Sequence, residues 1–183
     1  MAEAQQLKED LHYVAATVRR AEQYSPVASI CYLWAALVLV GFSLSDWSPQ
    51  HAGPFWLAAA PLGTLISFVL GWRAGRGTGE VDRALGARYA WHWGLALLGF
   101  VGVIFPAIGR AMPLDQEIPY FLLVAALAYG MAGVHLDPPL RNVGLIMFAG
   151  YAALTVFQLP YSWTVTGVLV CGALFYAGLR SQR

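Results

Sequence analysis

Two histidines and one aspartate are the residues of this chain whose types and spacing could bind a metal. His92 lies one helical turn inside an apolar segment that covers residues 89–109, and His135 directly follows another that covers residues 118–134. Asp137 comes two residues later. Because a short connection joins the two segments, we expect the imidazoles to approach each other. Two histidines and a carboxylate can hold a divalent metal with an open position, and two histidines can ligate a haem from both sides.

The same histidines also fit a simpler interpretation, in which each imidazole lies in the polar headgroup zone of a membrane. The chain has no fixed-spacing metal signature such as His-Glu-x-x-His. It also has no Gly-x-Ser-x-Gly turn, and no pair of carboxylates lies within one apolar segment. We therefore expect no enzymatic activity. A metal or haem site at His92 and His135 stays an alternative whose cofactor is unknown.

Six apolar segments must position these residues. They cover residues 26–46, 54–72, 89–109, 118–134, 142–158 and 161–179. Hydrophobic residues make up 58% of the chain and charged residues only 11%, whereas an ordinary soluble domain is about 25% charged. A helix that crosses a bilayer needs about 20 apolar residues. The sequence therefore predicts an all-α, polytopic membrane protein, in which a bundle of six transmembrane helices at 26–183 follows an N-terminal segment at 1–25.

Positive charges fall almost entirely on one side of these segments. With the segments drawn as crossings, ten of the eleven Lys and Arg residues share one compartment, and only Arg110 lies on the other side. Short basic connections stay cytoplasmic, so we expect an inner-membrane protein with both termini in the cytoplasm. The formal net charge of +1 argues against direct binding of nucleic acid. The longest basic connection is predicted to contact anionic lipid headgroups. Its arginines are Arg73, Arg76, Arg83 and Arg88.

An apolar stripe precedes the first crossing. Leu7, Leu11, Val14 and Val18 recur at spacings of four, three and four residues, which places them on one face of a helix. Because this predicted cytoplasmic amphipathic helix lies outside the membrane, its apolar stripe is expected to be shielded from water by contact with another surface. An amphipathic helix in a groove is a common mode of recognition, so we expect the stripe to bind a cytoplasmic protein or a second copy of the chain. The leading hypothesis is a sensing, regulatory or scaffold protein.

A small-solute or ion transporter is the main alternative function. No Asp, Glu, Lys or Arg lies near mid-depth in the six segments, and such charges usually mark ion and proton routes. A transporter would instead need a water-accessible cavity lined by the polar residues that remain at depth. The candidates are Thr64, Ser67, Gln158 and Thr166.

Two stretches of the chain also carry family-like motifs. The first runs from Asp10-Leu11-His12-Tyr13-Val14 to Arg19-Arg20-Ala21-Glu22, and the second contains Tyr129, Gly130, Gly133, Pro139, Gly144, Phe148 and Gly150. Together they resemble an uncharacterised family of small bacterial membrane proteins with six transmembrane helices, whose genes often lie beside those of winged-helix regulators. The resemblance implies the same six-helix fold and a sensing or regulatory partnership, and it assigns no functional residues.

Overall fold

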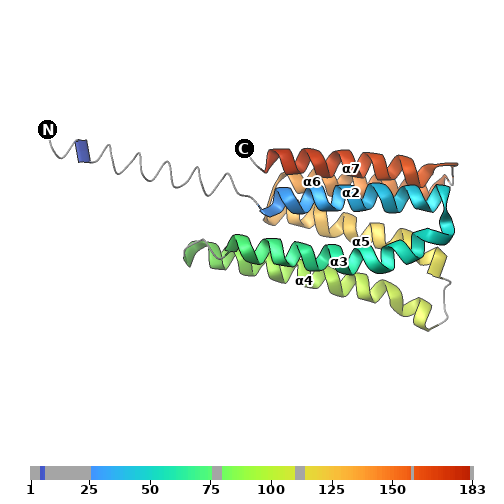
Figure 1. The fold of residues 1–183 in the computed structure, drawn as a ribbon, viewed down its shortest axis with the longest axis horizontal. Helices are drawn as coiled ribbons and strands as arrows, with labels where there is room; N and C mark the ends of the chain where they lie inside the picture. The colour runs from blue at the N-terminus through green and yellow to red at the C-terminus, as the bar shows by residue number, and fades with distance from the viewer. Residues whose placement is uncertain (1–4, 7–25, 76–79, 110–113, 158, 182–183) are drawn as a thin grey trace.

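Six long helices that run back and forth along a common axis make up the fold (Figure 1). The computed structural model describes residues 5–6, 26–75, 80–109, 114–157 and 159–181, and within these ranges every regular element is helical. The helices are α2 (Pro26–Trp47), α3 (Pro49–Gly75), α4 (Glu80–Ile108), α5 (Leu114–His135), α6 (Pro139–Val156) and α7 (Ser162–Arg180).

All six helices are long and apolar enough to span a membrane, by length and composition. Their apolar windows are Ala28–Trp47, Pro49–Arg73, Leu85–Pro106, Ile118–His135, Pro139–Val156 and Ser162–Arg180. Each window overlaps one segment expected from the sequence, so the predicted number and order of apolar helices are confirmed. The predicted N-terminal amphipathic helix lies outside the described residues, apart from Gln5 and Gln6.

Two connections that the sequence predicts are partly helical in the structure. The turn formers at 46–53 and the prolines at 135–141 predict connections, but α3 begins at Pro49 and α6 begins at Pro139. Proline is well tolerated in the first turn of a helix, because the N–H groups there have no intrahelical acceptor. Only Ser48 separates α2 from α3. These two prolines therefore begin helices, which the sequence analysis did not anticipate.

Each helix packs against its neighbours in sequence, and α7 closes the arrangement by packing against α2. The most extensive contacts join α2 to α7 and α5 to α6, whereas α3 and α4 barely touch. The core lies among α2, α5, α6 and α7 (Figure 1). Val143 of α6 and Val170 and Leu174 of α7 are fully buried there. The apolar window of α4 contains no buried residue, so α4 is a peripheral helix that packs on α5.

Small residues let the core helices approach closely. Phe42 of α2 occupies the space beside Gly167 of α7, where an added Cβ atom would lie 2.8 Å from the Phe42 Cβ. Gly94 and Gly102 of the peripheral helix α4 have open space instead. In lipid, where no hydrophobic force drives helices together, close packing of this kind is a main source of helix–helix stability. The tight contacts therefore identify the α2–α7 pair as part of the structural core.

Candidate functional site

Arginines gather at one end of the bundle. This end holds the starts of α2, α4 and α6 and the ends of α3, α5 and α7 (Figure 1). Every Lys or Arg whose side chain the structure describes lies there, and we refer to it as the basic end. These residues are Arg73, Arg88, Arg141 and Arg180. Within the described residues, the charge is therefore as one-sided as the sequence predicts.

An open pocket of about 460 Å³ lies at the basic end between α4 and α5. Its lining residues are Ala87, Arg88, Trp91, His92, His135 and Leu136. The two histidines that the sequence predicts to approach each other therefore line one pocket. None of the lining residues that the structure describes is acidic, so Arg88 gives the pocket a positive charge. This α4–α5 pocket is the candidate functional site.

One hydrogen bond and one ring contact orient the His92 imidazole. Its Nε2 lies 3.0 Å from the carbonyl oxygen of Ala128 in α5. Because a carbonyl oxygen can only accept, Nε2 carries the proton and donates it, which leaves Nδ1 as the second ring nitrogen. The Trp93 ring packs edge-on against the imidazole, with 5.2 Å between the ring centroids. It also contacts the Tyr129 ring of α5, with 5.1 Å between the centroids. The protein therefore fixes the His92 ring without help from a ligand.

Asp137 does not complete a metal site with the two histidines. Its Oδ2 accepts a hydrogen bond of 2.7 Å from the Ser181 hydroxyl, which directs the carboxylate to the end of α7. Among the residues that the structure describes, no group of three or more His, Cys, Asp or Glu could hold a metal ion. The pocket thus offers two candidate ligands, His92 and His135, and the metal or haem site stays a prediction.

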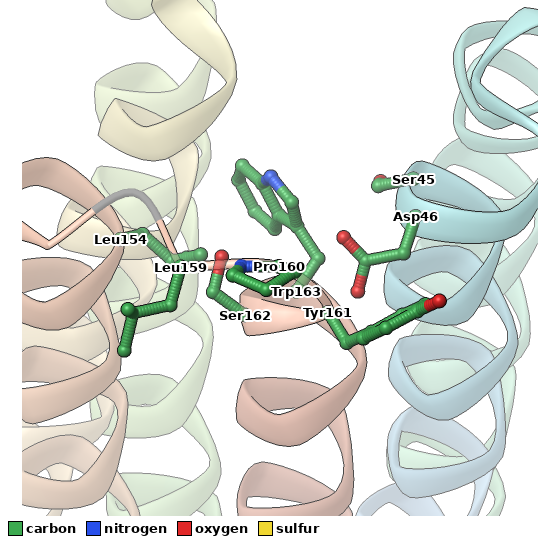
Figure 2. A pocket seen from close by; sticks show the side chains of 8 residues that line it. All are labelled: Ser45, Asp46, Leu154, Leu159, Pro160, Tyr161, Ser162 and Trp163. Atoms are coloured by element: carbon green, nitrogen blue, oxygen red, sulfur yellow. The ribbon is translucent and has the colours of Figure 1, made fainter.

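A second pocket, of about 440 Å³, lies at the opposite end of the bundle (Figure 2). It is lined by Ser45, Asp46, Leu154, Leu159, Pro160, Tyr161, Ser162 and Trp163. Asp46, near the end of α2, accepts a hydrogen bond of 2.6 Å from the Thr164 amide in the first turn of α7. Amides in a first turn have no acceptor within their own helix, and a negative charge there also suits the helix dipole. Asp46 therefore caps α7 from another helix.

Replacing Asp46 by alanine is expected to destabilise the bundle by about 1–2 kcal/mol, because the Thr164 amide loses its acceptor and α7 loses a favourable charge. Asp46→Asn keeps an acceptor oxygen in the same place and is expected to lose substantially less. The measurement is the free energy of unfolding in detergent. Equal losses for the two variants would contradict this role for the hydrogen bond.

The polar residues that a transporter would need do not meet around either pocket. Thr64 is exposed on α3, whereas Thr166 is buried in α7. The Ser67 hydroxyl accepts a hydrogen bond of 3.0 Å from Nε1 of Trp34, which joins α3 to α2. Gln158 lies outside the described residues. Of the three described residues, Thr64 therefore lies on the surface, Ser67 joins two helices and Thr166 is buried in the core.

Several predicted site residues lie outside the described part of the chain. These are Leu7, Leu11, Val14, Val18, Arg76 and the side chain of Arg83. Of the other arginines predicted to contact headgroups, Arg88 lines the α4–α5 pocket, and Arg73 is exposed at the end of α3 and does not line it. The sequence analysis missed Trp91 as a site residue. Its position three residues after Arg88, about one helical turn, is the signal that places both on one face.

Comparisons of the chain with protein-family models, with curated proteins and with solved structures find no match. The family resemblance seen in the sequence therefore stays a prediction, and only the residues of the chain and their placement indicate a function.

Proposed function

We propose that this chain is a multi-pass inner-membrane protein without enzymatic activity, whose basic end and both termini face the cytoplasm. It acts as a sensing, regulatory or scaffold protein and binds a cytoplasmic protein partner through the apolar stripe near its N-terminus. The residues of that stripe are Leu7, Leu11, Val14 and Val18. The observation that carries the proposal is the combination of a largely apolar outer surface with arginines at one end of the bundle.

The outer surface of the bundle supports insertion into lipid. Large apolar side chains are exposed on the peripheral helices, such as Leu57 at 80%, Phe68 at 71% and Leu98 at 67%. Soluble monomers rarely expose contiguous apolar patches larger than a few hundred Å². Lipid tails supply the apolar surroundings that these side chains need. The arginines at the basic end favour the cytoplasm for that end, because basic connections stay on the cytoplasmic side.

The position and composition of the stripe support the docking part of the proposal. The helix α2 begins at Pro26, so the segment that carries the stripe is attached at the basic end. Four apolar side chains on one face of a helix would not stay exposed to water. Two leucines and two valines form a weak membrane-surface anchor, since such helices commonly use larger apolar faces with Trp, Phe and Leu. A groove on a protein partner therefore suits the stripe better than the headgroup zone.

A charge placed in the stripe is expected to abolish partner binding. Leu11→Glu and Val14→Glu each put a carboxylate into the apolar contact, whereas Ala16→Glu adds the same charge on the opposite side of the predicted helix. The measurement is covalent crosslinking of the full chain in intact cells. Burying an unpaired charge costs enough to weaken binding at least about tenfold.

The matched variant decides how that experiment is interpreted. The parent chain and the Ala16→Glu variant are expected to give the same crosslinked species, which both stripe variants lose. A crosslinking pattern that is the same for all four proteins would contradict docking through the stripe.

A further inference from the structure

We propose that the α4–α5 pocket binds the phosphate group of an anionic membrane phospholipid. The ligand is a phosphodiester whose oxygens contact Arg88 and His135, with its glycerol beside Trp91. This inference goes beyond the proposed function and relies only on the membrane placement within it.

The charge of the pocket and its unused donors support an anionic ligand. Arg88 and two histidines line the pocket, and none of its described lining residues is acidic. Within the described residues, neither the Arg88 nor the His135 side chain has a hydrogen-bond or ion-pair partner. A guanidinium presents its donors in a planar fork that matches two phosphate oxygens, and an imidazole N–H adds another donor. A basic lining with no acid among its described residues therefore favours an anion from outside.

The pocket also lies at the level that lipid headgroups occupy. His135 is the last residue of the apolar window of α5, and Arg88 lies in the first turn of the apolar window of α4. Because α4 and α5 are antiparallel neighbours, these residues reach the same level. Trp91 is 74% exposed and lies one turn further along α4, which suits the amphipathic side chains found at the boundary between headgroups and tails. Basic pockets between helices on the cytoplasmic side are sites for anionic headgroups.

The grouping of its side chains distinguishes the site from a diffusely charged surface. Arg88, Trp91 and His135 come from two different helices and line the same open pocket. The hydrogen bond from His92 to the Ala128 carbonyl holds one wall of the pocket in place. Arg141 lies at the same end of the bundle but outside the pocket, so it provides a matched control for charge alone.

Native mass spectrometry of the purified full chain in detergent tests this proposal. The probes are palmitoyl-oleoyl phosphatidylglycerol, the zwitterionic phosphatidylcholine with the same acyl chains, and inorganic phosphate. We expect saturable binding of phosphatidylglycerol and weaker binding of phosphatidylcholine. Arg88→Gln and His135→Gln are each expected to weaken phosphatidylglycerol binding about fivefold, the factor that one basic residue contributes near a membrane surface. Arg141→Gln is expected to leave it unchanged.

Three results would overturn the proposal. Equal weakening by Arg141→Gln and Arg88→Gln would indicate diffuse surface attraction. Displacement of the lipid by inorganic phosphate, with the same dependence on Arg88, would assign the pocket to a soluble phosphate. Saturable binding of Zn²⁺ that excludes the lipid and is lost in His135→Gln would assign it to a metal. A chain that stays monodisperse without detergent would instead refute the membrane placement, so the two failures are distinguishable.

Discussion

Gly144→Ala is expected to destabilise the bundle by about 1–3 kcal/mol, although it adds a single methyl group. Gly144 lies in α6 at its contact with α5, and an added Cβ atom would lie 2.6 Å from the Gly130 Cα and 2.7 Å from the Ala126 carbonyl oxygen. Both are backbone atoms, which cannot swing aside as the end of a flexible side chain can. The added methyl group would therefore force α5 and α6 apart at a close backbone contact between them.

Gly130, on the opposing helix of the same contact, provides the matched control. A Cβ atom added at Gly130 would have no neighbouring atom within 4 Å, so the methyl group of Gly130→Ala meets open space. This variant is expected to be neutral or to gain up to about 1 kcal/mol, because alanine restricts the unfolded chain. The measurement is the free energy of unfolding of both variants in the same detergent. Similar losses at Gly130 and Gly144 would contradict the close backbone approach of α5 and α6.

Helix number and order could be predicted from the sequence, but the partners of each helix could not. The length of each apolar segment indicates a helix, because a crossing needs about 20 apolar residues. The strong pairing of α2 with α7 joins the first and last helices of the bundle. No polar outer face in the sequence indicates this pairing. In a soluble bundle, polar residues would reveal which face of each helix points outward. Lipid-facing residues are as apolar as the core, so that signal is missing here.

The candidate site could be predicted in part for the same reason. The neighbouring positions of His92 and His135 follow from a short connection between antiparallel helices, and Arg88 was expected at the same membrane surface. That all three line one pocket depends on the rotation of α4 about its own axis, which apolar residues on every side of α4 leave undetermined. The cap that Asp46 provides for Thr164 spans 118 positions in sequence, and no local pattern predicts it.

Cysteines placed at the two ends of the bundle are expected to differ completely in their reaction with a membrane-impermeant maleimide. Gln50 is exposed in the first turn of α3, at the end opposite the arginines. Asn142 is exposed in the first turn of α6, at the basic end. Neither side chain belongs to the core, so Gln50→Cys and Asn142→Cys are expected to fold normally. Under the proposed sixfold crossing, successive crossings alternate in direction, so the two positions are expected to face opposite sides of the membrane.

The parent chain serves as the control for this labelling. Its Cys31 is buried in α2, and its Cys171 lies in the middle of α7. A water-soluble reagent does not reach thiols inside a bilayer, which is where the proposed arrangement puts both of them. We therefore expect almost no labelling of the parent chain in intact cells.

Labelling of the two variants, before and after the inner membrane is permeabilised, most directly tests the sixfold crossing with a cytoplasmic basic end. We predict that Gln50→Cys reacts in intact cells and that Asn142→Cys reacts only after permeabilisation. Reaction of Asn142→Cys in intact cells, or recovery of either variant in the soluble fraction without detergent, would contradict this arrangement.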